Sequence, residues 1–233
     1  MDHYFTNNQK LKSNINVLNK NIRGKEYLFY TDNGVFSKSA LDFGTKLLIE
    51  ALPFEKMQGT VLDMGCGYGP IGLSIKNETT CEVDMVDINL RALHLAKMNA
   101  KKNKLDVNIF ESDAYTNIRH KYNYIITNPP IRAGKKKVYE ILRGANNYLN
   151  ENGELWFVLR KDQGAKTTVR DIGDIYTVKT IVKDKGYFVF CATKRGKSVD
   201  IAWYVWYYLK LVLCFLNMFF EKNYYGVKWW LTM

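Results

Sequence analysis

A glycine-rich stretch from residue 61 to 72 contains the residue types best suited to binding a small ligand. A short apolar run ends at Asp63, glycines occupy every second position up to Gly69, and Pro70 opens a new apolar run. Glycine permits a positive φ and a close approach of the backbone to a ligand. Proline is well tolerated in the first turn of a helix. The stretch therefore predicts a buried strand, a tight turn and a helix whose N-terminus faces a bound molecule.

Two ligand classes fit this stretch, and the carboxylate discriminates between them. Residues 67–72 match the dinucleotide pattern G-x-G-x-x-G, and Asp87 follows Gly67 at the spacing which that pattern requires. Residues 63–69 instead resemble the first motif of class I S-adenosylmethionine-dependent methyltransferases. The Asp63 carboxylate would repel a pyrophosphate, whereas it suits the ammonium and sulfonium charges of S-adenosylmethionine. We therefore predict that this methyl donor binds here.

Acidic residues also follow the next two expected strands. The carboxyl ends of strands in a doubly wound sheet meet at one crevice, so these side chains should share a site. Asp87 is placed to accept both ribose hydroxyl protons of the donor. Asp113 can accept from the adenine amino group while the Ala114 N–H donates to the ring. The predicted cofactor-binding residues are Asp63, Gly65, Cys66, Gly67, Asp87, Ile88, Asp113, Ala114 and Asn128.

The tetrapeptide Asn128-Pro129-Pro130-Ile131 indicates the chemistry of the acceptor. It resembles the (Asn/Asp)-Pro-Pro-(aromatic) motif of methyltransferases that act on planar exocyclic nitrogens, whose lone pair is delocalised and weakly nucleophilic. The Asn128 side-chain carbonyl and the Pro129 backbone carbonyl would hold the two protons and aim the lone pair at the methyl group. The prolines fix the backbone so that these carbonyls face inward. Asn128, Pro129 and Pro130 are thus the predicted catalytic residues.

The residues after this corner predict how the substrate is held. Ile131 replaces the usual aromatic residue, so stacking on a target base would come from elsewhere, with Phe36 or Tyr4 as possible sources. Four positive charges follow between residues 132 and 137, and cations beside a base pocket suit the phosphates of a polynucleotide. The predicted substrate-binding residues are Phe36, Ile131, Arg132, Lys135 and Lys136.

Alternating apolar runs predict the elements that position these residues. A strand over 25–32 and a helix capped by Thr45 and stopped by Pro53 come first, after a polar segment over 1–25. Strands are then expected at 61–64, 82–86, 107–110, 122–127, 153–159, 176–182 and 187–193, with helices between most of them. This pattern predicts an α/β fold of the Rossmann-like methyltransferase type. Its sheet is doubly wound, mainly parallel and seven-stranded, with an antiparallel final strand.

The amino-acid composition indicates the class of binding partner and the cellular compartment. The net charge of +11 favours an anionic partner, with nucleic acid ahead of a membrane. The four cysteines form no C-x-x-C pair and the three histidines are scattered, so we expect buried thiols and no metal site. Residues 1–25 contain no apolar signal-peptide core, which predicts a cytoplasmic protein.

Five motifs taken together resemble one family, the bacterial 16S ribosomal RNA guanine-N2 methyltransferases in their short single-domain form. The motifs lie at residues 34–37, 41–45, 63–72, 86–92 and 128–135. The resemblance covers roughly residues 1–195. It implies methylation of a guanine N2 in 16S ribosomal RNA, with the RNA or the small ribosomal subunit as partner and S-adenosylmethionine as cofactor. It also implies that isoleucine after the two prolines is normal in this branch. The larger members carry an additional N-terminal half.

Two other functions use parts of the same pattern. A protein-glutamine N5 methyltransferase would hold its amide in the same way, although that family usually has an aromatic residue where Ile131 stands and needs fewer of the cations at 132–137. A non-catalytic RNA-binding protein could retain the fold, but the intact Asp63, Asp87 and Asn128 argue against it.

The end of the chain differs in character from the rest. We place a methyltransferase domain at 1–198, of which 1–53 form an N-terminal extension, and an aromatic, apolar tail at 199–233. The near-continuous apolar run at 201–220 approaches the length of about 20 residues that spans a bilayer. A membrane or interfacial anchor, a helix packed on the domain and a non-native extension all fit this tail. We favour the non-native extension, because the composition changes where the resemblance stops.

Overall fold

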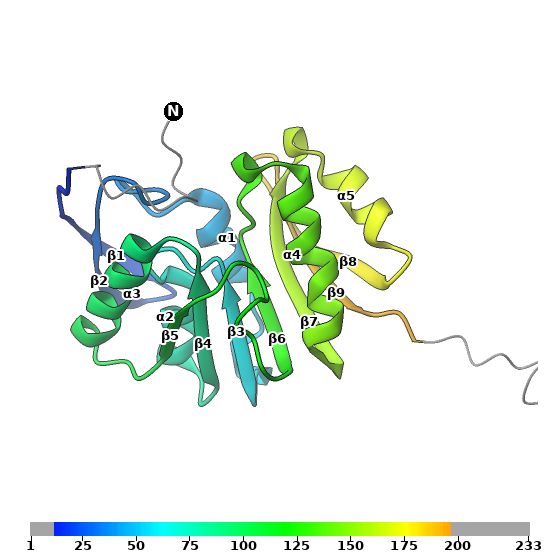
Figure 1. Ribbon diagram of the computed structural model, residues 1–233, viewed down its shortest axis with the longest axis horizontal. Coiled ribbons are helices and arrows are strands. Elements are labelled where there is room, and N and C mark those ends of the chain that lie inside the picture. The colour runs from blue at the N-terminus through cyan, green and yellow to red at the C-terminus, as the bar shows by residue number, and fades with distance from the viewer. Residues whose placement is uncertain (1–11, 197–233) are drawn as a thin grey trace, which may run out of the picture. The chain divides into compact units, whose positions relative to one another are not determined.

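A seven-stranded, mainly parallel sheet forms the centre of the computed structural model, which describes residues 12–196 (Figure 1). The strand order is β5-β4-β3-β6-β7-β9-β8. Every pair from β5 to β7 is parallel, while β9 runs antiparallel to β7 and β8. The strands are β3 (Thr60–Met64), β4 (Glu82–Asp87), β5 (Asn108–Glu111), β6 (Tyr122–Thr127), β7 (Leu149–Arg160), β8 (Tyr176–Asp184) and β9 (Tyr187–Lys194). The predicted fold class is confirmed.

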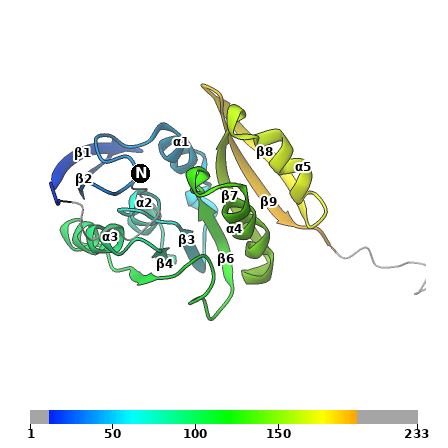
Figure 2. The ribbon, with the colours of Figure 1, turned by 45° about the horizontal axis from the view of Figure 1, so that its top comes forward.

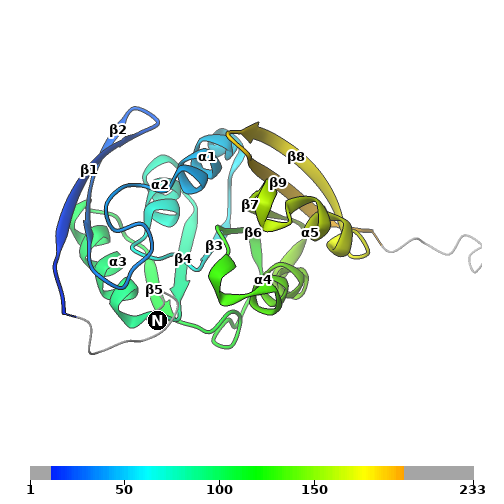
Figure 3. The same ribbon diagram turned by 90° about the horizontal axis from the view of Figure 1, so that it is seen from above.

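Helices cover both faces of this sheet (Figure 3). One face carries α1 (Phe43–Ala51), α2 (Pro70–Glu78) and α3 (Leu90–Lys102), and the other carries α4 (Lys135–Tyr148) and α5 (Ala165–Ile172). Neighbouring residues of β3 point to opposite faces, so Val61 joins the hydrophobic cluster under α1–α3 while Leu62 joins the cluster under α4 and α5. Strands buried on both faces explain why their sequences are nearly continuous apolar runs.

The N-terminal end contains one strand that the sequence did not predict, and the predicted N-cap of its helix was wrong. The segment before residue 25 contains a strand, β1 (Asn16–Ile22), which pairs antiparallel with β2 (Lys25–Thr31). Its mostly exposed polar residues lack the apolar alternation that indicates a strand, and only the pairing reveals it. Helix α1 begins at Phe43 and its N-cap is Asp42, not Thr45. Within residues 12–196, three short 3₁₀ helices complete the elements, namely η1 (Phe54–Lys56), η2 (Ile131–Ala133) and η3 (Lys161–Gln163).

Asn99 of α3 and Asn103, the C-cap of α3, attach the β1–β2 hairpin to the domain. Figure 2 shows the hairpin beside α3. The Asn99 amide accepts from the Tyr30 N–H at 2.6 Å and donates to the Tyr30 carbonyl at 3.0 Å. Asn103 repeats this pattern at Leu28, with distances of 3.2 and 2.9 Å. A side-chain amide carries one donor group and one acceptor, so each asparagine replaces a neighbouring strand along the edge of β2.

Asn99→Ala should lower the free energy of unfolding by about 2–3 kcal/mol, because Asn99 is fully buried and its loss leaves three backbone groups unpaired. Chemical denaturation followed by circular dichroism measures the change. Asn108→Ala is the matched control, since Asn108 is exposed and bonds one side chain, and it should change stability by less than about 0.5 kcal/mol. Equal stability of the two variants would show that the hairpin is not anchored here.

Some predictions fall on residues outside the described range. Tyr4 and the aromatic tail over 199–233 belong to these, so the proposed boundary at residue 198 remains a prediction. Between residues 12 and 196, no helix combines the length and the apolar character needed to cross a membrane.

Candidate active site

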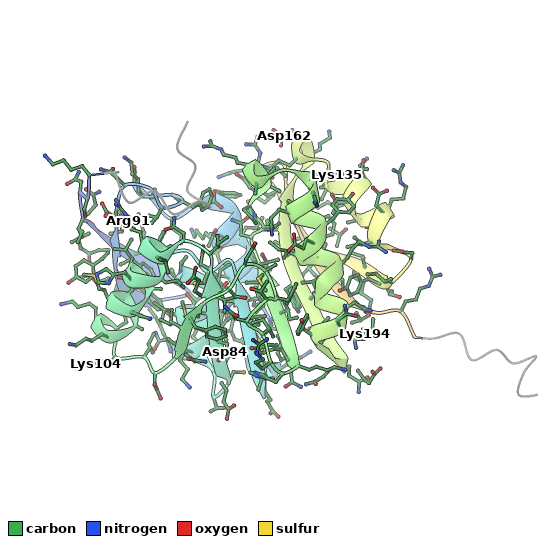
Figure 4. The ribbon with its side chains drawn as sticks, viewed as in Figure 1. Asp84, Arg91, Lys104, Lys135, Asp162 and Lys194 are labelled. Carbon is green, nitrogen blue, oxygen red and sulfur yellow. The ribbon has the colours of Figure 1, made fainter. Side chains whose placement is uncertain are left out.

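A cavity opens at the carboxyl ends of β3, β4, β5 and β6, where the sequence places its polar motifs. Figure 4 shows Lys135 and Asp162 at this end of the molecule, and Lys104 toward the opposite end. The lining residues come from the ends of these four strands and the loops after them, from the segment before α1 and its first turn, and from α2, α3 and α4. The ones used below are Phe36, Asp42, Thr45, Gly65, Cys66, Gly67, Tyr68, Asp87, Ile88, Asp113, Ala114, Asn128, Pro129, Pro130 and Lys137.

The glycine turn after β3 leaves room for a ligand against the backbone. The Gly65 and Cys66 N–H groups both donate to the Val86 carbonyl at 2.9 Å, which holds the turn onto β4. Gly65 and Gly67 have φ values of 75° and 58°, and a Cβ on either would meet no atom within 4 Å. Both glycines line the cavity, so a bound molecule can contact the main chain there.

Asp63 lies beneath this turn and does not line the cavity. Its side chain is fully buried, and its Oδ2 accepts the Gly72 N–H at 2.8 Å. Its Oδ1 has no partner within the described residues. Burial is the main reason that its pKa rises from 3.8 to about 7, and the nearby Asp87 raises it further. The geometry makes Asp63 a support of the turn and of the first turn of α2, and its predicted cofactor contact remains a prediction.

The stability of the ligand-free protein should fall as the pH rises from about 4 to about 7, because folded Asp63 keeps a proton that the unfolded chain has released. Asp63→Asn removes this titration and should flatten that dependence. Asp87, whose pKa burial also raises, would contribute the remaining slope with the same sign. Urea unfolding at several pH values measures both proteins. An unchanged slope in the variant would assign the pH dependence to other groups.

Asp87 connects β4 to the glycine turn at the edge of the cavity. Its Oδ2 accepts the Gly67 N–H and its Oδ1 accepts the Asn89 N–H, both at 2.9 Å. Asn89 in turn caps α3 by accepting from the N–H groups of Arg91 and Ala92. The carboxylate is therefore fixed by backbone donors at the place where a hydroxyl-bearing ligand can reach it, and Ile88 lines the cavity beside it.

The loop after β5 brings Asp113 and Ala114 to the cavity wall. Ala114 is buried with a φ of 47°, and Asp113 is exposed. The Asp113 carboxylate lies 2.8 Å from the Lys137 ammonium, which is equally close to Glu140. Lys137 thus lines the cavity as part of an ion-pair network between β5 and α4, a role the sequence did not indicate.

Asn128 directly follows β6, and hydrogen bonds hold the NH₂ group of its side chain. Its Nδ2 group donates to Asp42 Oδ2 at 3.1 Å and to Thr45 Oγ1 at 2.9 Å. Asn128, Pro129 and Pro130 all line the cavity, as do both acceptors. The sequence motif at 41–45 suggested only a helix start, and nothing local in it indicates a partner more than 80 residues away.

The predicted substrate-binding residues separate into two groups. Phe36 lines the cavity, with 39% of its surface exposed. Ile131, Arg132, Lys135 and Lys136 do not, because the chain turns through η2 and through Gly134 at a φ of 91° before α4 begins. The three cations are exposed, and Lys135 lies 3.5 Å from Asp171. Their contact with substrate remains a prediction, and it would lie outside the cavity.

No group of three or more potential metal-ligating side chains was found in residues 12–196. Cys66, Cys81 and Cys191 are free and buried.

Comparisons with known proteins show the family to which this chain belongs. The family model of the methyltransferase small domain matches residues 26–191. The chain belongs to this family. The Bacillus subtilis protein YbxB is 39% identical over 198 residues, which are 83% of this chain and 98% of that protein. Ribosomal RNA small subunit methyltransferase C of Psychromonas ingrahamii is 38% identical over 146 residues, and the chain spans 42% of its length.

A solved structure of the methyltransferase family resembles the fold closely. The Thermus thermophilus 16S rRNA N2 G1207 methyltransferase RsmC, in complex with AdoMet and guanosine, superposes with a TM-score of 0.69 at 26% identity. The match covers 78% of this chain and 51% of that one. Membership of the class I methyltransferases is thereby confirmed, as is S-adenosylmethionine as the cofactor.

The residues of the cavity fit S-adenosylmethionine. The open backbone at Gly65 and Gly67 provides a cradle that a Cβ would fill, and Asp87 provides a fixed acceptor beside it. Asp87 and Asp113 line the cavity, and carboxylates favour a ligand with ammonium and sulfonium charges.

Proposed function

We propose that this chain transfers a methyl group from S-adenosylmethionine to the N2 amine of a guanine in 16S ribosomal RNA, in the cytoplasm. The observation that carries the proposal is the corner formed by Asn128 and Pro129 at the cavity wall. The Nδ2 group of Asn128 is held by two acceptors, which leaves its Oδ1 to accept a hydrogen from the substrate. An acceptor there fits an exocyclic amine and does not fit a carbonyl or an acceptor nitrogen.

The role of the protein in this reaction is to orient a weak nucleophile. The bound donor supplies an electrophilic methyl group on a sulfonium. Asn128 Oδ1 and the Pro129 carbonyl would accept the two amine hydrogens, pull the nitrogen toward a tetrahedral geometry and aim its lone pair. The prolines lack N–H groups and fix φ, so this corner keeps its shape. Phe36, which lines the cavity and is 39% exposed, would stack on the target base.

A guanine in RNA is favoured over other amines by two further observations. The related RsmC structure contains guanosine, and several curated relatives are ribosomal RNA methyltransferases. Exposed Arg132, Lys135 and Lys136 lie just past the corner and would bind phosphates on either side of the target nucleotide. A glutamine in a protein would need no such cations.

Transfer of tritiated methyl from S-adenosylmethionine tests the proposal. The substrates are unmodified 16S ribosomal RNA, small ribosomal subunits that lack the modification, and a release factor, with Asn128→Ala as the inactive control. We expect label in RNA or subunits, and mass spectrometry of the digested RNA should place it on N2 of guanine. Label in the release factor alone would indicate the protein-glutamine N5 methyltransferase. Donor binding with no transfer to any substrate would indicate a non-catalytic RNA-binding protein.

A further inference from the structure

Asp42 contacts the side chain that the proposed reaction depends on. It lies on the loop before α1, lines the cavity and bonds the Asn128 amide from the side. We infer that Asp42, with Thr45, is a positioning residue that selects one of the two orientations of the Asn128 amide. The inference rests on the proposed function, since it concerns how Asn128 presents its carbonyl to an amine.

The hydrogen bonds assign the orientation of the amide without ambiguity. Asp42 Oδ2 accepts the Thr45 N–H at 2.8 Å, the Thr45 hydroxyl at 3.2 Å and Asn128 Nδ2 at 3.1 Å. The Thr45 oxygen, having donated its hydrogen to Asp42, accepts the second Nδ2 hydrogen at 2.9 Å. An ionised carboxylate can only accept, so the NH₂ end of Asn128 must face it. Both Nδ2 hydrogens are then used, and Oδ1 is the end that remains for a substrate.

The position of Asp42 is itself fixed by the fold. Its carboxylate caps α1, whose first turn includes Thr45, 4% exposed. Gly44 lies so close to β9 that a Cβ there would come within 2.8 Å of the Tyr187 ring. The first turn of α1 is therefore packed closely against the Tyr187 side chain of β9. A rigid support holds a reacting group within the narrow geometry that catalysis requires.

The opposite orientation of Asn128 would prevent the proposed reaction. It would present NH₂ to the amine of the substrate, two donors would face each other, and no acceptor would draw the lone pair toward the methyl group. Without Asp42 the two orientations differ much less in energy, because Thr45 Oγ1 can either donate or accept. The loss of Asp42 should therefore reduce the fraction of competent enzyme and leave the donor site unchanged.

Substitutions that separate capping from positioning test this inference. Asp42→Ser keeps a good N-cap for Thr45 but is too short to reach Asn128, and should lower kcat about 10- to 100-fold. Its Kd for S-adenosylmethionine should stay within about 3-fold of the wild-type value. Asp42→Asn can place one oxygen where Oδ2 lies and should restore most of the lost kcat. Asp106→Ser, in an exposed loop after α3, is the control and should match wild type.

A double-mutant cycle distinguishes positioning from a general structural effect. In an Asn128→Ala background, Asp42→Ser should cause no further loss of kcat, because its target is absent. Multiplicative losses, or a failure of Asp42→Asn to restore activity in a folded protein, would overturn the inference.

A measurement independent of activity keeps the inference separate from the proposed function. In NMR spectra of the wild type, the Asn128 side-chain NH₂ hydrogens should exchange slowly with solvent, and Asp42→Ser should speed this exchange while Asp42→Asn restores it. Fast exchange in the wild type would overturn the inference. Slow exchange together with no methyl transfer to any RNA would instead reject the proposed function.

Discussion

Asn128→Ala should lower kcat for methyl transfer by about 10²- to 10³-fold, the size expected when one preorganised group at a reacting centre is lost. The alanine removes the oxygen that accepts a hydrogen of the target amine and leaves Pro129 as the sole acceptor of the corner. The donor should bind normally, because the glycine turn and Asp87 do not depend on this side chain. Single-turnover transfer and calorimetric titration with S-adenosylmethionine measure the two quantities separately.

Asn147→Ala is the control for Asn128→Ala. Asn147 is exposed on α4 and should be replaceable without effect on either quantity. A parallel loss of kcat and of donor affinity in Asn128→Ala would mean that the residue supports the donor site and does not act on the amine.

Asp87→Ala should weaken S-adenosylmethionine binding by about 10²-fold, since hydrogen bonds to a charged group contribute about 1.5–3 kcal/mol. The carboxylate would accept the ribose hydroxyls of the donor, and it already holds the Gly67 and Asn89 N–H groups. Its loss removes the ligand contact and releases the turn that cradles the donor. Saturating donor should recover much of kcat, which contrasts with the behaviour of Asn128→Ala.

The matched control for Asp87→Ala is Asp106→Ala, which removes the same charge from an exposed loop. It distinguishes a local contact from a change in net charge. If Asp87→Ala lowered kcat at saturating donor while its Kd stayed constant, Asp87 would act on the chemical step and not on donor binding.

The sequence predicts the donor side of the site better than the acceptor side. Gly65, Gly67, Asp87 and Ala114 lie at or within three residues of the carboxyl end of a strand. Parallel strands must bring these ends to one edge, so a local pattern was sufficient to place them at the cavity. Asp63 instead lies within β3, one residue before its end, and α2 encloses it. A Cβ on Gly72 would come within 2.6 Å of Met85, which shows how closely the helix approaches there.

The acceptor side depends on contacts between distant segments. Asp42 meets Asn128 because α1 packs against the sheet, and Lys137 turns inward because Asp113 and Glu140 bind its ammonium. The sequence also did not show in which direction the basic residues after the Pro-Pro corner point. Gly134, at a positive φ, directs Lys135 and Lys136 away from the cavity. Strand β1 was not predicted for a related reason, because it is stabilised by pairing with β2 and has no apolar pattern of its own.

The side-chain amide of Asn99 links the β1–β2 hairpin to the donor loop, which is the turn between β3 and α2. Besides its two bonds to Tyr30, it donates to the carbonyl of Tyr68 at 2.8 Å, and Tyr68 belongs to the turn between β3 and α2. A displacement of the hairpin therefore reaches the donor loop through the Asn99 side chain and through the Phe29 ring, which packs edge-on against the Tyr68 ring. Substitutions at hairpin positions that do not contact the ligand would for this reason disturb the donor loop. A mutational screen would then score them as losses of catalysis.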